Sequence, residues 1–265
     1  MTNLPTYSIV ITTFVYRLET YYKPLMNAIC RMRPDIDKIV FVNGQHKKEF
    51  DQGYRREIMR FSSLCPKTYL VMSPIVRGCS FMWNTGFNFT SSDYILTLSD
   101  DIMVTDGFFD HYEGMLLDRA EKGHESFRIN YSFAHFSIYR PDLFDVGYFD
   151  ERLLGFGEED GDWLWRYEAT KRRTMPLYHT KALLHACDQA PTNAENMVGH
   201  SGSKYSRFNR EWMFRCKYDH ESKEIDPSRP HPSGMFSRPL QMYPDVVNLD
   251  LYPAEKWYRD NIHKV

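Results

Sequence analysis

Short apolar runs alternate with segments of helical spacing over the N-terminal part of the chain. Four of the runs are rich in β-branched residues and are closed by polar or turn-forming residues, as buried strands are: residues 7–14, 38–42, 68–72 and 94–98. Between them, apolar residues recur every three or four positions, as Tyr22, Leu25, Met26 and Ile29 do, and predict helices. This alternation predicts an α/β fold with a mostly parallel central sheet flanked by helices.

The rest of the chain is less regular. It predicts a helix around residues 108–120, a pair of strands within 127–139 and a short strand over 175–178. From about Gln189 the sequence is rich in polar residues, prolines and aromatic residues. We therefore predict a body that covers residues 1–188, and an irregular C-terminal extension, residues 189–265, that packs on the body or covers its site.

Composition narrows the function classes. The chain has 33 basic and 35 acidic side chains, a formal net charge of −2, which gives no electrostatic case for general nucleic-acid binding. Five cysteines without a CxxC pair favour reduced thiols, and no leader or membrane-spanning run is recognisable, so a cytoplasmic protein is expected. Aromatic and basic residues near the C-terminus either pack on the body or meet a lipid-linked acceptor at a membrane: Trp257, Tyr258, Arg259 and Lys264.

Two adjacent carboxylates, Asp100 and Asp101, follow the predicted strand over residues 94–98. Ligands of open α/β sheets lie beyond the carboxyl ends of the strands, and a carboxylate pair there suits a hard divalent cation that carries a phosphorylated substrate. The alternative is a solvated turn, in which aspartate is common. His185 follows a short strand and would complete such a site if it converged on Asp101.

A second acidic group, residues 158–162, holds four carboxylates between glycines and an apolar-aromatic run. The pattern predicts a loop that leads into the first turn of a helix, where acidic residues are favoured without any catalytic role. Crowding of like charge also raises the pKa of one member, which suits a general base. We favour the functional interpretation, with Asp160 as the base and Glu159 second.

Residues 77–86 are a third candidate segment. Arg77, Gly78 and Ser80 stand near a predicted helix start, where a cation, a glycine and a hydroxyl could meet a diphosphate. An arginine followed by glycine is also ordinary in loops, so this segment alone predicts little.

These segments occur in a recognisable order. Residues 77–86 end in Asn-Thr-Gly, Ser-Asp-Asp stands at 99–101, Gly-Tyr-Phe-Asp-Glu at 147–151 and Glu-Asp-Gly-Asp at 159–162. The combination resembles the GT-A fold nucleotide-sugar glycosyltransferases, especially the inverting family-two-like group, over about residues 7–188. Ser99 is a departure, because it stands where the strict Asp-x-Asp signature has its first acid.

The resemblance implies a Rossmann-like GT-A fold with a nucleotide-binding half, residues 1–106, and an acceptor-side half, residues 107–188. It implies that Asp101 binds Mn²⁺ or Mg²⁺ together with His185, and that Asp160 or Glu159 is the catalytic base. It assigns the remaining site residues to the nucleotide-sugar: Thr12, Thr13, Asn43, Arg77, Asn84 and Asp100.

The implied reaction is metal-dependent transfer of a sugar, with inversion, from a nucleotide diphosphate donor such as a UDP-sugar to a hydroxyl of a glycan or lipid-linked acceptor. A sugar-phosphate nucleotidyltransferase is one alternative. It would carry a glycine-rich loop after the first strand, and residues 12–17 contain no glycine. A noncatalytic carbohydrate-binding module that uses the many Tyr and Trp side chains is the other.

Overall fold

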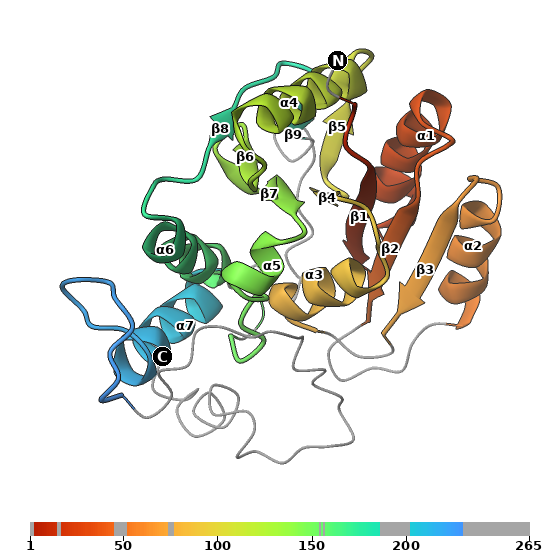
Figure 1. The fold of residues 1–265 in the computed structure, drawn as a ribbon. Coiled ribbons are helices and arrows are strands. Elements are labelled where there is room, and N and C mark those ends of the chain that lie inside the picture. Colours follow the sequence, from red (N-terminus) through yellow and green to blue (C-terminus); the bar gives the residue numbers. More distant parts are fainter. Residues whose placement is uncertain are drawn as a thin grey trace. The chain divides into compact units, whose positions relative to one another are not determined.

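The computed structural model describes residues 3–14, 17–44, 52–73, 77–153, 155, 157–185 and 202–229 (Figure 1). These residues divide into two compact units. The first draws on the described parts of Met1–Val76, Gly86–Asp142 and Pro176–Asn196, and the second on those of Arg77–Thr85, Leu143–Met175 and Met197–Val265. The C-terminal aromatic and basic residues considered for membrane contact lie outside the described residues. The predicted boundary at residue 188 stays a prediction.

A seven-stranded sheet forms the centre of the first unit, in the order β3-β2-β1-β4-β7-β6-β8. Strands β1 to β4 are mutually parallel and β7 is antiparallel to β4, so the predicted mostly parallel α/β sheet is confirmed. Strand β6 is antiparallel to β7 and parallel to β8. The bounds are β1 Tyr7–Phe14, β2 Lys38–Asn43, β3 Thr68–Met72, β4 Tyr94–Ser99, β6 Phe127–Ile129, β7 Ser132–Tyr139 and β8 Leu177–Tyr178.

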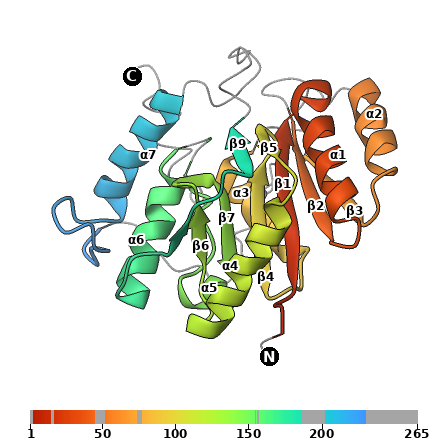
Figure 2. The ribbon, with the colours of Figure 1, turned by 90° about the horizontal axis from the view of Figure 1, so that it is seen from above.

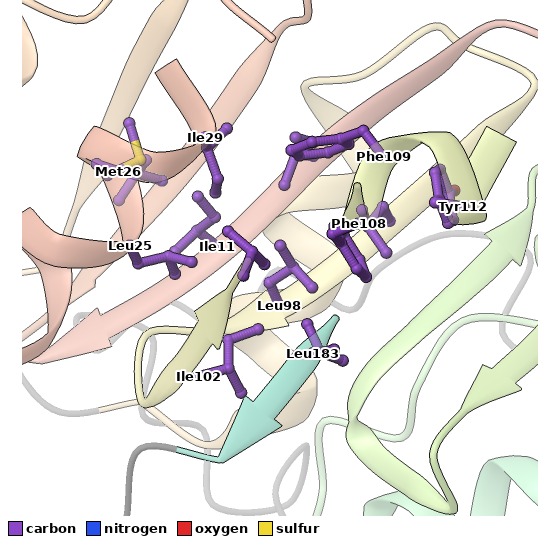
Figure 3. Close-up of a cluster of buried hydrophobic side chains, with 14 of the residues drawn as sticks. Ile11, Leu25, Met26, Ile29, Leu98, Ile102, Phe108, Phe109, Tyr112 and Leu183 are labelled. Atoms are coloured by element: carbon purple, nitrogen blue, oxygen red, sulfur yellow. The ribbon is translucent and has the colours of Figure 1, made fainter. Parts of the chain in front are cut away.

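The main core lies between one face of this sheet and helices α1 (Lys23–Met32), α2 (Gln52–Ser62) and α4 (Phe108–Lys122). Figure 2 shows these helices along the strands, and Figure 3 shows Ile11 of β1 and Leu98 of β4 among the side chains that they bury. A π-helical turn, η1 (Leu18–Tyr22), leads into α1. The apolar positions with helical spacing in the sequence are the ones that face this core.

The C-terminal end of α3 (Cys79–Asn88) packs on the other face of β1 through Gly86. A Cβ atom at Gly86 would lie 2.4 Å from Val10 Cγ1, closer than a real carbon contact allows. Glycine is therefore needed here because the helix backbone approaches the strand so closely.

Two three-residue strands were not predicted from the sequence. Strand β5 (Ile102–Val104) follows the carboxylate pair directly and is antiparallel to β9 (Leu183–His185), with Ile102 opposite His185. The pairing brings the segment after residue 180 back to the carboxyl end of β4.

The second unit is built mainly from α6 (Glu159–Lys171) and α7 (Gly202–Cys216), with the short α5 (Asp142–Asp145) near its start. Trp163 of α6 stacks on Phe149 at a ring separation of 5.5 Å, and Trp212 of α7 is buried. Among the residues that the structure describes, no helix has both the length and the apolar character needed to cross a membrane.

Candidate functional site

Asp100 and Asp101 lie at the carboxyl end of β4, next to the end of β1. Thr12 of β1 pairs with Ser99, and its carbonyl oxygen accepts a hydrogen bond of 3.2 Å from the Asp100 amide. The Thr13 hydroxyl donates to Asp100 Oδ2 at 2.6 Å. The parallel pairing of β1 with β4 therefore brings together three of the predicted donor-site residues in the first unit.

Arg17 holds the two carboxylates together. Its Nη2 lies 3.0 Å from Asp100 Oδ1 and 3.3 Å from Asp101 Oδ2, and its guanidinium packs 4.3 Å from the centre of the Tyr21 ring. Asp100 is 1% exposed, whereas the Asp101 side chain keeps 19% of its surface and accepts a hydrogen bond from the Ser99 hydroxyl. Of the pair, Asp101 is thus the carboxylate that a ligand can reach.

Burial dominates the ionisation of Asp100. It raises the pKa of Asp100 to about 7, although the neighbouring Arg17 guanidinium and the Thr13 hydroxyl favour the charged form. The charge of Asp101 raises the pKa further. Both Asp100 oxygens are engaged by Arg17 and Thr13, so its predicted contact with a ribose stays a prediction.

Asn43 and His185 also belong to the first unit. Asn43 ends β2, opposite Phe14 of β1, and is fully buried, with its side-chain oxygen accepting from the Gly44 amide. The backbone of His185 stands opposite Ile102, one residue after Asp101. The strand pairing thus places the His185 backbone near the carboxyl end of β4. Its side chain lies outside the described part of the structure, so its role as a metal ligand stays a prediction.

The donor atoms at this edge are of the kind that bind a hard cation. The Asp101 carboxylate and the Ser99 hydroxyl offer oxygen ligands, which Mg²⁺ and Mn²⁺ prefer. Arg17 already neutralises part of the Asp101 charge. Within the described residues, no three His, Cys, Asp or Glu side chains are grouped as a ready-made metal site. The residues therefore fit a cation that draws further ligands from elsewhere, such as a diphosphate.

The second acidic group forms the start of α6 in the second unit. Glu158 precedes the helix with a left-handed backbone (φ 76°), and the Gly157 amide donates to Glu159 Oε2 at 2.6 Å. Glu159 is buried, while Asp160 keeps part of its surface and accepts from the Gly161 amide at 2.8 Å. The predicted loop that enters a helix is therefore present.

Burial and like charge suppress ionisation at this helix start. Burial raises the pKa of Glu159 to about 8, and the neighbouring Asp160 adds to the effect. The pKa of Asp160 is also raised, first by burial, with the Gly161 amide opposing the shift and the charge of Glu158 adding to it. The pKa of the Cys79 thiol, which is hydrogen-bonded to Glu159, is raised well above its ordinary value for the same reasons.

Arg77 and Asn84 belong to the second unit. The Arg77 guanidinium lies 4.8 Å from the centre of the Phe81 ring. Asn84 is fully buried; its amide nitrogen donates to the Phe149 carbonyl and to Glu151, and its oxygen accepts from the Phe149 amide. Asn84 thus ties α3 to the Phe-Asp-Glu segment, and a contact with a nucleotide-sugar stays a prediction.

A buried ionic cluster supports the start of α6. Lys217, just after α7, is fully buried; its Nζ lies 2.9 Å from Asp150 Oδ2 and also bonds Asp162. Asp150 pairs with Arg152 at 2.7 Å and Asp162 with Arg166 at 2.9 Å. Burial opposes ionisation of both aspartates, yet the surrounding cations outweigh it and lower the pKa of each. Both therefore stay charged.

Helix α7 also holds the residues just before α6. The Asn209 amide donates to the Gly157 carbonyl at 2.7 Å, and Arg210 lies 2.8 Å from Glu158 Oε1. A Cβ atom at Gly157 would lie 2.7 Å from Ser206 Cβ, so a larger residue does not fit between loop and helix. The acidic helix start is thus fixed by contacts from a segment about fifty residues away in sequence.

The comparisons with known proteins find similar structures but no matching family model or curated sequence. Among solved structures, TarS of S. aureus matches with a TM-score of 0.53 at 12% identity, over 83% of this chain and 41% of TarS. Glucosyl-3-phosphoglycerate synthase of Mycobacterium tuberculosis matches with a TM-score of 0.55 at 12% identity, over 79% of each chain. Both are GT-A glycosyltransferases.

The chain has the GT-A fold. The resemblance inferred from the order of the motifs is confirmed at this level. This GT-A sheet explains why Thr12, Thr13 and Asp100 meet although 87 residues separate Thr13 from Asp100. The chain spans less than half the length of TarS.

Sequence reasoning missed two charged residues of this GT-A chain. Arg17 stands three residues after Phe14, the last residue of β1. A cation so soon after the first strand could have been recognised in the sequence as a partner for the carboxylates at the same edge of the sheet. Lys217 stands four residues after the buried Met213 and so continues the buried face of α7. That spacing was visible, but a lysine near a helix end reads first as a solvent-exposed residue.

Proposed function

We propose that the chain is a metal-dependent inverting glycosyltransferase that moves a sugar from a nucleotide diphosphate donor, with a UDP-sugar favoured, to an acceptor hydroxyl. The observation that carries the proposal is the reachable Asp101 beside the buried Asp100 at the carboxyl end of β4, in a chain with the GT-A fold. The structure of glucosyl-3-phosphoglycerate synthase contains Mn²⁺, UDP and glucosyl-3-phosphoglycerate, and one TarS structure contains UDP. These ligands support a uridine nucleotide as the first donor to test.

We assign cation binding to Asp101, with His185 as a second ligand. When bound, Mn²⁺ or Mg²⁺ would supply positive charge near a departing diphosphate. Thr13 and Arg17 fix Asp100 and so set the position of Asp101, which follows it in the same turn. Arg77 is the side-chain cation that we assign to the diphosphate of the donor.

Asp160 is the base that we assign to the acceptor hydroxyl. A base has to reach its proton and be ionised at the working pH. Glu159 is buried with a pKa of about 8, so at neutral pH it is mostly protonated. Asp160 is less buried, and burial raises its pKa from the ordinary aspartate value, which makes it a stronger base than a solvated aspartate.

Asp160→Asn tests the base. It keeps the shape of the side chain and the acceptor for the Gly161 amide but removes the basic oxygen. We expect donor turnover with Mn²⁺ to fall by about a hundredfold or more while donor binding is kept. The control is Asp145→Asn, the same change at a carboxylate of this unit that is 55% exposed. Turnover near wild type in a folded Asp160→Asn variant would rule out the assignment.

Asp101→Asn tests the cation ligand. We expect calorimetric affinity for UDP to lose its dependence on Mn²⁺, since a neutral amide binds a hard cation poorly. Asp106→Asn, at a carboxylate that is 81% exposed, is the matched control in the first unit. An unchanged Mn²⁺ effect in Asp101→Asn would refute the metal role.

The product separates the proposal from the two alternatives raised by the sequence. A glycosyltransferase releases nucleoside diphosphate from a nucleotide-sugar. A nucleotidyltransferase would release pyrophosphate from a nucleoside triphosphate and a sugar phosphate, and a noncatalytic sugar-binding module would release neither. A panel of nucleotide-sugars with Mn²⁺, assayed for both products, decides among the three.

A further inference from the structure

The outward face of α2 and the turn that follows it carry a mixture of cations and apolar side chains. Exposed residues on this surface are Arg55, Arg56, Met59, Arg60, Leu64 and Lys67, which we call the basic face. The opposite side of the helix is buried in the core through Tyr54 and Ile58. Figure 1 shows α2 beside β3, which is an edge strand of the sheet.

The basic face contains three arginines and one lysine. Within the described part of the chain, no carboxylate forms an ion pair with Arg55, Arg56, Arg60 or Lys67. The one acidic residue of α2, Glu57, lies 3.6 Å from Lys23 Nζ and is thus directed to another helix. Four positive charges gather here in a chain whose formal net charge is −2, so the patch does not simply reflect an overall basic protein.

Two apolar side chains stand among these cations. Leu64 is 74% exposed and Met59 is 48% exposed, and Met59 lies one position before Arg60 on the helix. A single exposed apolar residue is ordinary. Exposed apolar side chains next to several cations are instead typical of surfaces that enter the headgroup region of a membrane, where acyl chains accept the apolar groups and anionic lipids pair with the cations.

We propose that the basic face binds an anionic lipid membrane peripherally. The four cations favour an anionic partner. Among anionic partners, the exposed Met59 and Leu64 side chains favour lipid, because only a lipid membrane also offers apolar chains for them to contact. A nucleic-acid backbone would engage the arginines but would leave both apolar side chains in contact with water. This inference uses no residue of the proposed catalytic sites, so it stands or fails independently of the proposed function.

Vesicle co-sedimentation of the full chain tests the proposal. Wild type binds phosphatidylglycerol vesicles at low salt and does not bind phosphatidylcholine vesicles. Each arginine near an anionic surface changes the partition coefficient by about fivefold, so R55Q/R56Q/R60Q lowers it by about a hundredfold. The matched control K122Q/R172Q/K181Q removes three exposed positive charges elsewhere and keeps wild-type binding.

A second variant, M59S/L64S, separates lipid insertion from charge pairing. It keeps every charge, so we expect weaker binding to phosphatidylglycerol that still rises as the salt concentration falls, because charge pairing is kept and only the insertion of the apolar side chains is lost. All substituted side chains are exposed, so the melting temperature should stay near that of wild type and loss of binding is not loss of fold. Equal binding of wild type and R55Q/R56Q/R60Q would overturn the proposal. So would tighter binding to a duplex DNA or polyglutamate probe than to the vesicles.

Discussion

Replacing Lys217 with methionine should weaken the second unit far more than the same change at the surface. Methionine keeps the unbranched chain of lysine and so leaves little cavity, but it removes the ammonium group that lies between Asp150 and Asp162. Loss of one partner from a buried ion pair costs about 3 to 5 kcal/mol of the free energy of unfolding.

Because two arginines also pair with these aspartates, the expected cost of Lys217→Met lies at the low end of that range. Arg152 still pairs with Asp150 and Arg166 still pairs with Asp162, so neither aspartate is left without a cation. We therefore expect a loss of about 3 kcal/mol for Lys217→Met. Lys171 lies 2.7 Å from Asp145, a carboxylate that is 55% exposed, and Lys171→Met should cost at most about 1 kcal/mol.

Urea unfolding followed by tryptophan fluorescence measures this difference. The four described tryptophans belong to the second unit, so the signal reports on the unit that contains Lys217: Trp83, Trp163, Trp165 and Trp212. With an m-value of about 3 kcal/mol/M, Lys217→Met lowers the urea midpoint by about 1 M. A Lys217→Met midpoint no lower than that of Lys171→Met would refute the reasoning, because the buried ammonium would then contribute no more than a surface one.

Two further predictions concern single contacts. Glu159 has a raised pKa in the folded protein, so its contribution to stability is full below pH 4.5 and is lost as the pH rises through about 8. Glu159→Gln should remove that slope and be more stable than wild type above pH 8, by about 5 kcal/mol. Urea midpoints measured across pH test this, and a variant that kept the wild-type slope would show that another group causes it. Gly86→Ala should cost about 2 kcal/mol because its Cβ would meet Val10, and Val10→Ala should relieve part of that loss in the double variant. If the losses of unfolding free energy in Gly86→Ala and Val10→Ala simply added up in the double variant, as measured by thermal unfolding, the contact between the two residues would be contradicted.

Much of the first unit could be predicted because its elements have a strong local signal. The runs that form β1 and β4 are β-branched and buried on both faces, and the carboxylates directly after β4 had to lie at the carboxyl edge of the sheet. Strands β5 and β9 could not be found in the same way. Each has only three residues, which is too short for an alternating pattern to stand out.

The contacts that complete the candidate sites depend on tertiary structure. Arg17 meets Asp100 and Asp101 only because β1 and β4 are adjacent strands, which sequence spacing does not fix. Lys217 meets Asp162 across 55 residues, and no local rule distinguishes such a lysine from a solvated one. Asn84 was expected to contact a nucleotide-sugar. Its side-chain amide instead forms hydrogen bonds with Phe149 and Glu151, because a buried amide needs hydrogen-bond partners.

The ionic cluster around Lys217 also imposes an order on the folding of the chain during synthesis. Asp150 and Asp162 have arginine partners two and four residues away, so these pairs can form as soon as the local segment is made. Lys217 joins them only 67 and 55 residues after the two aspartates have been added. The contacts of Lys217 that complete the second unit can therefore form only after the ribosome has passed α7.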